Sequence, residues 1–263
     1  MIRALFSAGS GLNAQQMSID NIANNLANAN TTGFKARHTQ FADLLYQNFV
    51  QPGTSAGAQT IVPSGLQLGL GTRPTGNSID LSQGSFQLTN NPLDLVIQGK
   101  GFFQIMQPNG TIAYTRDGSF QLNATGGVVD ANGNPLEPAI TIPAQAQSVT
   151  VAQDGTVSYT LPAQVASQVA GQIQLANFAN PGGLNSIGNN LMLPTDASGE
   201  PTTDAPGGQA GMGTLQQGYV ENSNVSVVEE FIDMISSQRA YEADTKVVKA
   251  ADEMYQDINN LTQ

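Results

Sequence analysis

Two heptad patterns, one near each end of the chain, place the strongest constraint on how this sequence can fold. Near the N-terminus, apolar residues recur every seven residues, with smaller ones between them: Leu5, Leu12, Ile19 and Leu26, then Ala8, Ile22 and Ala29. Near the C-terminus, the second pattern comprises Ala240, Val247, Met254 and Leu261, with Ala251 and Ile258 between them. A stripe with this period packs along a partner helix, so we expect two terminal helices that pair.

The narrow width of the two stripes leaves two interpretations open. The terminal helices can pair only with each other, as in many globular proteins. Alternatively, the pair can also pack against neighbouring copies of the chain, because a core helix of a single domain usually has a wider apolar face. We treat the two stripes as a candidate assembly seam.

Between the helices, the sequence has the pattern of short antiparallel strands. Short runs rich in β-branched and aromatic residues, such as 93–97 and 102–106, alternate with turn dipeptides. The dipeptides are Asn109-Gly110, Asp117-Gly118, Asn132-Gly133 and Asp154-Gly155. Such pairs tolerate positive φ and close tight hairpins, which predicts an antiparallel sandwich or barrel. The predicted fold class is therefore mixed and mainly β, with coiled-coil-like helices at both ends and an extended connector.

The pattern predicts three regions along the chain. Residues 1–30 and 225–263 form a terminal helical coiled-coil domain. Residues 31–70 and 205–224 form an extended connector, and residues 71–204 form a β-rich outer domain.

The charge of the chain argues against two classes of partner. Its net charge is −11, and no cluster of Lys or Arg occurs anywhere. A nucleic-acid binder needs basic residues to displace phosphate counterions, and an anionic membrane surface attracts basic segments. Charged residues are only 11% of the chain, against about 25% in typical soluble domains. We therefore expect no nucleic-acid binding and no membrane insertion, and the low charge favours burial in an assembly.

Residues able to do chemistry are sparse. The chain has no cysteine and one histidine, His38. These counts exclude thiol nucleophiles and the usual zinc sites. Residues 130–134 resemble part of a calcium loop but lack the closing acidic residue. We therefore expect no catalytic residue, no cofactor and no metal site, and predict that the protein is not an enzyme.

The N-terminal segment also resembles a known family signature. Residues 10–14, Ser-Gly-Leu-Asn-Ala, and 21–35, Asn-Ile-Ala-Asn-Asn-Leu-Ala-Asn-Ala-Asn-Thr-Thr-Gly-Phe-Lys, are similar to the signature of bacterial flagellar rod and hook axial proteins. The positions that carry the signature are Asn24, Asn25, Asn28, Thr32, Gly33 and Phe34. Residues 99–105, 114–120 and 218–242 resemble further motifs of the family, in the expected order.

A connector segment narrows the resemblance to the distal-rod members of the family. Residues 44–69 are similar to their connector, including an insertion that hook members lack. Its characteristic positions are Tyr46, Gln47, Pro52, Gly53, Pro63, Gly65 and Leu66. Residues 54–62 depart from the family pattern because they carry less charge than expected.

The resemblance implies a function and a set of partners. It implies a structural subunit that polymerises helically into the distal rod of the flagellar basal body, the shaft that transmits torque from motor to hook. The implied partners are other copies, proximal-rod and hook subunits, the P and L rings, and the flagellar type III export apparatus. The rod would span the periplasm, and we expect export without a cleaved signal peptide, because the N-terminus lacks a sustained apolar region.

Three alternatives remain at this stage. The nearest is a proximal-rod or hook subunit of the same family. A secreted β-rich adhesin or carbohydrate-binding module explains the polar strands but not the paired heptads. The third alternative is a cell-wall hydrolase. The sequence argues against it, because it contains neither a candidate pair of acids nor a candidate nucleophile with a base.

Overall fold

The computed structural model describes residues 2–53, 55–57, 60–61, 64–162, 166–208 and 211–261. It confirms the predicted fold class: the chain is mainly β, its sheets are antiparallel, and its two terminal helices pack together. The chain divides into two compact units. The first comprises Met1–Ala27, Arg37–Ser78 and Ser226–Gln263, and the second comprises Asn28–Ala36 and Ile79–Val225.

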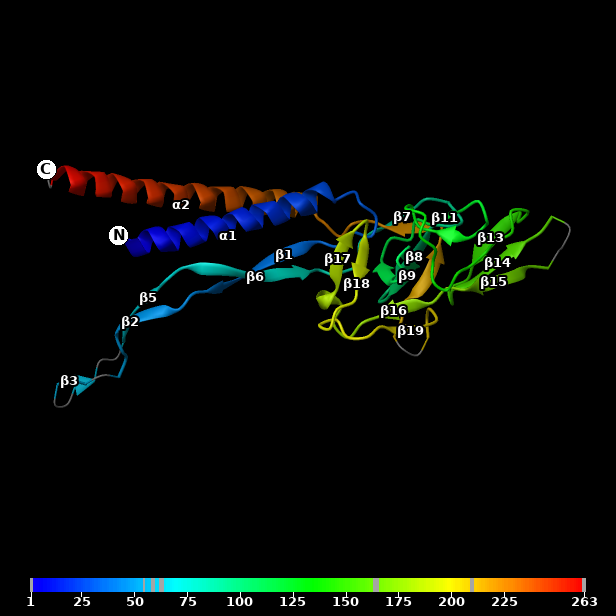
Figure 1. The fold of residues 1–263 in the computed structure, drawn as a ribbon, viewed down its shortest axis with the longest axis horizontal. Helices are drawn as coiled ribbons and strands as arrows, with labels where there is room; N and C mark the ends of the chain where they lie inside the picture. Colours follow the sequence, from blue (N-terminus) through cyan, green and yellow to red (C-terminus); the bar gives the residue numbers. More distant parts are fainter. Residues whose placement is uncertain are drawn as a thin grey trace. The chain divides into compact units, whose positions relative to one another are not determined.

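Two long helices form one part of the first unit. Helix α1 spans Ile2–Ala27 and helix α2 spans Val227–Leu261. They run side by side in opposite directions, with the two chain termini at the same end of the pair (Figure 1). The predicted period of seven therefore corresponds to helix pairing within the chain.

Paired strands complete the first unit. Strand β1 (Arg37–Asp43) pairs with β6 (Thr72–Ile79) and also contacts α1. Strand β2 (Tyr46–Val50) pairs with β5 (Leu66–Gly69), and between them β3 (Ser55–Gly57) pairs with β4 (Thr60–Ile61). The segment from 37 to 78 is therefore a set of strand pairs and belongs to the same compact unit as the helices.

The second unit is built from short antiparallel strands. Its six-stranded sheet has the order β17 (Asn185–Gly188), β18 (Leu191–Leu193), β10 (Ile112–Thr115), β9 (Phe102–Met106), β16 (Leu175–Asn177) and β19 (Thr202–Asp204). A three-stranded sheet holds β13 (Ser148–Val151), β14 (Thr156–Thr160) and β15 (Gln168–Gln172). Three further pairs are β20 (Thr214–Gln217) with β8 (Leu95–Gln98), β21 (Tyr219–Glu221) with β7 (Phe86–Leu88), and β11 (Gln121–Leu122) with β12 (Val128–Val129). A short 3-10 helix, η1, spans Pro181–Gly183.

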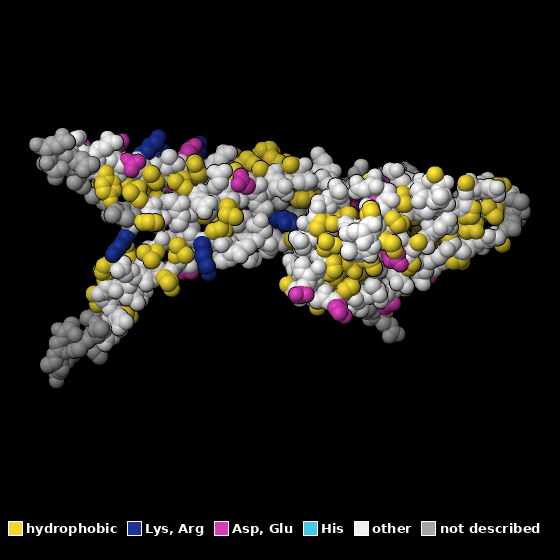
Figure 2. Space-filling view, in the orientation of Figure 1, with side chains coloured by type: hydrophobic (Ala, Val, Ile, Leu, Met, Phe, Trp, Pro, Cys, Tyr) yellow, Lys and Arg dark blue, Asp and Glu magenta, His cyan; other side chains and the backbone are white. Residues whose placement is uncertain are grey.

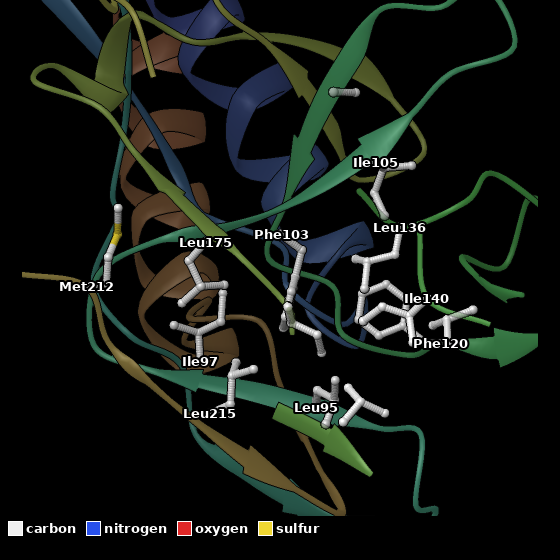
Figure 3. Close-up of a cluster of buried hydrophobic side chains, with 14 of the residues drawn as sticks. Leu95, Ile97, Phe103, Ile105, Phe120, Leu136, Ile140, Leu175, Met212 and Leu215 are labelled. Atoms are coloured by element: carbon white, nitrogen blue, oxygen red, sulfur yellow. The ribbon is translucent and has the colours of Figure 1, made fainter. Parts of the chain in front are cut away.

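The apolar core of the second unit lies among these strands (Figure 3). Phe103, Ile105, Leu136 and Leu175 are fully buried there. The rings of Phe103 and Phe120 meet edge to face, with centroids 5.1 Å apart. This core explains why the runs at 93–97 and 102–106 are nearly continuous in apolar residues.

The predicted turns are present, with one correction. Gly110, Gly133 and Gly155 have positive φ, as expected for the second residue of Asn-Gly and Asp-Gly turns. Gly118 does not have positive φ, so that expectation is wrong at Asp117-Gly118. Glycine is needed at 118 because a Cβ there would lie 1.7 Å from the carbonyl oxygen of Leu95.

Candidate assembly surfaces

Contacts at seven-residue intervals tie α1 to α2. Asn25 Nδ2 donates to Glu230 Oε1 (2.8 Å), the Ser18 and Ser237 hydroxyls lie 3.4 Å apart, and a Cβ on Gly11 would lie 2.6 Å from Asp244 Oδ2. From one pair to the next, the residue number falls by seven on α1 and rises by seven on α2, as expected for antiparallel helices. The seam within one chain is therefore built from small and polar side chains, which allow the two backbones to approach closely.

The predicted seam residues occupy several different environments. On α1, Ile22 and the interleaved Ala8 are buried, whereas the remaining positions are partly exposed: Leu5, Leu12, Ile19 and Leu26. On α2, Ala240 is partly buried, while Val247 and Met254 are 47% and 49% exposed. The side chains of Ile258 and Leu261 lie outside the described residues. In a single chain, the α1 positions are thus buried or partly exposed, whereas Val247 and Met254 are open on the surface.

Asn25 connects three elements of the first unit. Its side chain is almost fully buried, its Nδ2 also donates to the Arg37 carbonyl oxygen (2.9 Å), and its Oδ1 accepts from the Arg37 backbone N–H (3.0 Å). Asn21 Nδ2 adds a bond to Thr39 Oγ1 (3.0 Å). A side-chain amide matches a backbone peptide in its donor and acceptor, so Asn25 pairs with β1 much as another strand would. This role gives a physical reason for asparagine at a signature position.

The polar contact around Asn25 opens into a pocket between α1, β1 and α2. Its charged and titratable lining residues are Arg37, His38, Glu230 and Asp233. Burial raises the pKa of Glu230, and the hydrogen bond from Asn25 partly opposes this rise. The carboxyl of Glu230 is thus a titratable group within the contact between α1 and α2.

The second half of the signature lies in the second unit. Gly33 has φ +67°, and its N–H donates to the Glu221 carbonyl oxygen (2.7 Å). A Cβ at this position would lie 2.6 Å from the backbone nitrogen of Asp117, so both conformation and space require glycine. Thr32 accepts a bond on its carbonyl oxygen from Asn190 Nδ2 (3.1 Å). The other signature residues are Asn24, which is exposed, and Asn28 and Phe34, which are partly buried.

An ion cluster beside Gly33 was not foreseen from the sequence. Lys35 Nζ lies 2.6 Å from Glu221 Oε1 and 2.7 Å from the carbonyl oxygen of Ser82. Arg116 Nη1 lies 3.6 Å from Glu221 Oε2, and all three charged side chains are buried. Burial lowers the pKa of Lys35, while the bond to Glu221 opposes that effect. The cluster joins residues that are 186 positions apart, and no local pattern indicates it.

The paired strands β2 and β5 expose an apolar surface. Their exposed side chains include Leu45 just before β2, which is 85% exposed, and Tyr46, Phe49, Leu66 and Leu68. Gln47 is exposed as well, and Pro52 and Gly53 form a turn. A Cβ on Gly65 would lie 2.5 Å from the Val50 carbonyl oxygen. Pro63 lies outside the described residues. Apolar side chains are visible on the surface of the first unit (Figure 2), and such groups mark interaction sites when they are contiguous.

The structure also bears on membrane and metal chemistry. Among the described residues, neither helix is long and apolar enough to cross a membrane. Within the same part of the chain, no group of three His, Asp or Glu side chains could hold a metal ion.

A helix pair and a strand pair that both expose apolar side chains are features of a structural subunit that assembles with other chains. Models of three families match the sequence in three segments. They are described as Flagella basal body rod protein (residues 5–35), Flagellar hook protein FlgE/F/G D1 domain (96–159) and Flagellar basal body rod FlgEFG protein C-terminal (216–261).

Full-length relatives place the chain more closely. It is 47% identical over 261 residues to the flagellar basal-body rod protein FlgG of Buchnera aphidicola subsp. Baizongia pistaciae, covering 99% of this chain and 100% of that protein. Identity to the proteins of the same name is 46% in Caulobacter vibrioides and 39% in Bacillus subtilis, each covering 99% of both chains. The chain belongs to the FlgG family of flagellar basal-body rod proteins.

Proposed function

We propose that this chain polymerises helically into the distal rod of the flagellar basal body and transmits torque from the motor to the hook. Support comes from the match to basal-body rod proteins along almost the whole chain. The single observation that carries the helical assembly is the exposed apolar surface on α2, β2 and β5, which a lone soluble chain would not be expected to keep in water.

In this proposal, each region of the chain has its own place in the rod. The terminal helices, residues 1–30 and 225–263, form the inner tube, and residues 71–204 form the outer wall. Residues 31–70 and 205–224 connect the two, and the exposed strands β2 and β5 contact neighbouring copies. The assembly seam then comprises the apolar positions of both helices, including Val247 and Met254, whose exposure in one chain leaves them available to a second copy.

The proposal includes further partners and a location. Proximal-rod subunits lie below, hook subunits lie above, and the P and L rings surround the rod where it spans the periplasm. The chain reaches this place through the flagellar type III export apparatus. We also propose that it is not an enzyme and uses no cofactor, since the relatives named above are all described as rod proteins.

The distal position within the rod can be tested by deletion. Removing residues 46–63 deletes strands β2, β3 and β4 and leaves β5 without its partner strand. A distal-rod subunit should then give rods of altered stiffness or length, visible by electron microscopy of basal bodies. If rods and swimming are unchanged, the connector has no such role, and a proximal-rod or hook assignment becomes the better one.

A further inference from the structure

Three lines of residues can be distinguished around α2. Glu230, Ser237 and Asp244 face α1, as their contacts with it establish. Successive residues of an α-helix are about 100° apart. Val228 and Ile235 each precede a residue of this line by two positions, so they lie about 200° around the helix, on its back.

Val247 and Met254 define a second surface of α2. Val247 follows Asp244 by three positions, and Met254 follows the buried Ala251 by three. Three steps amount to about 300°, which places both residues on one flank of the helix, about 60° from the line that faces α1 and about 140° from the back. The back and the flank are therefore two separate apolar surfaces of one helix.

All four of these side chains are open in the single chain. Val228 and Ile235 are 69% and 57% exposed, and Val247 and Met254 are about half exposed. Phe231 and Ile232 are exposed too and widen the back between its two main residues. Contiguous apolar groups on a helix surface indicate an interface.

We propose that the flank of α2 in one copy packs on the back of α2 in the next copy, with Val247 against Val228 and Met254 against Ile235. This inference rests on the proposed function, because it specifies a contact within the rod. The two pairs have the same spacing of seven residues, so both contacts form at once between helices that point the same way. The offset of 19 residues corresponds to about 28 Å along the helix axis, at about 1.5 Å per residue.

Two features identify the occupant as a second copy of this chain. First, the two surfaces differ, so they form a head-to-tail contact that repeats from copy to copy, whereas a two-fold dimer needs one surface that matches itself. Second, opposite charges fall at the same end of the contact. Arg239 follows Ile235 by four positions on one copy, and Asp257 follows Met254 by three on the other.

The absence of cysteine in this sequence allows a direct test by disulfide cross-linking. Two double variants, V228C/V247C and I235C/M254C, place one cysteine on each surface. Within one chain the two positions are about 28 Å apart along the helix, far beyond the about 7 Å between Cα atoms that a disulfide allows. Every disulfide must therefore join two copies. The variant V228C/M254C is the matched control, because its register is wrong by seven residues.

Rods formed by each variant are checked by electron microscopy, oxidised, and run on a non-reducing gel. The expected result is a ladder of dimers, trimers and longer products for both matched variants and little product for the control. A single dimer band, or rods without cross-links, overturns the proposed contact. If a double variant does not assemble, M254C and I235C chains are mixed in equal amounts and assembled together, and lack of a mixed dimer in those rods overturns it equally. Failure of the unmodified chain to form rods would instead remove the proposed function itself, and this contact with it.

Discussion

Lys35 Nζ lies 2.6 Å from Glu221 Oε1, and each side chain is only 1% exposed. Lys35 directly follows the signature residues Gly33 and Phe34, and Glu221 ends strand β21. The Gly33 N–H also donates to the Glu221 carbonyl oxygen, so backbone and side chain of Glu221 are held by the same short segment. The end of the signature segment therefore has a structural role in the second unit, where it binds Glu221 from a distant part of the sequence.

Replacing Lys35 with Met should destabilise the second unit strongly. Removal of Lys35 leaves the buried Glu221 carboxylate with the backbone N–H of Gly84 (3.0 Å) and the longer contact to Arg116. Loss of one partner of a buried ion pair typically costs about 3–5 kcal/mol. Denaturant unfolding followed by circular dichroism measures the change in free energy of unfolding. Lys100→Met, which removes an exposed cation, is the control and should change stability little. Equal stability of the two variants would contradict the assigned importance of the ion pair.

Gly33→Ala should lower the melting temperature more than Gly110→Ala. Both glycines have positive φ, so both variants suffer backbone strain of about 1–3 kcal/mol. A Cβ at 33 would also lie 2.6 Å from Asp117 N, whereas at 110 no described atom lies within 4 Å. The difference between the two melting temperatures therefore isolates the close approach. Similar values for the two variants would mean that the backbone at 33 relaxes.

Stability of the helix pair should fall as the pH rises through the pKa of Glu230. Burial raises the pKa of this carboxyl in the folded chain, so the folded state holds its proton more tightly than the unfolded state. The resulting stabilisation is fully present below the ordinary pKa of 4.5 and is lost as the pH rises through the folded value. Hydrogen exchange of α1 and α2 between about pH 4 and about pH 8 would measure it.

Glu230→Gln is the informative variant for this pH effect. Glutamine keeps an acceptor for Asn25 but cannot titrate, so the pH dependence of exchange in this region should flatten. Glu242→Gln, which changes an exposed carboxyl of the same helix, is the control and should leave the dependence in place. An unchanged pH profile in the Glu230→Gln variant would mean that another group causes the effect.

Ile22→Asp should block assembly while leaving the second unit folded. Ile22 is buried beside the helix seam, and burial of an unpaired carboxylate costs several kcal/mol. Swimming motility reports assembly, and the melting of the purified chain reports the β unit. Leu122→Asp places the same charge on an exposed apolar position of β11 and should be tolerated. Normal swimming of the Ile22→Asp variant would contradict the role of the seam.

The parts of the structure that the sequence predicted are those encoded by residues close together in the chain. Periodicity predicted both helices and their pairing, and Asn-Gly or Asp-Gly pairs predicted turns such as those at Gly110 and Gly133. The contact positions of the seam were harder to find, because apolar patterning selects large residues such as Val247, whereas Ser18 and Ser237 meet in the structure. Small and polar residues carry little weight in a hydrophobic pattern.

Polar contacts between distant residues could not be predicted from the sequence, for a different reason. Asn25 and Glu230 are 205 positions apart, and Lys35 and Glu221 are 186 apart. Single residues of this kind have no period and no local partner, so nothing in a window of sequence marks them. The resemblance to the family pointed to Asn25 and Gly33, and the structure supplied their physical roles.

The most direct test of a distal-rod role is electron microscopy of basal bodies from a strain that lacks this protein. The account predicts rods that stop short of the outer membrane, restored to full length when the unmodified chain is supplied. Basal bodies with complete rods and attached hooks in the absence of the protein would contradict it.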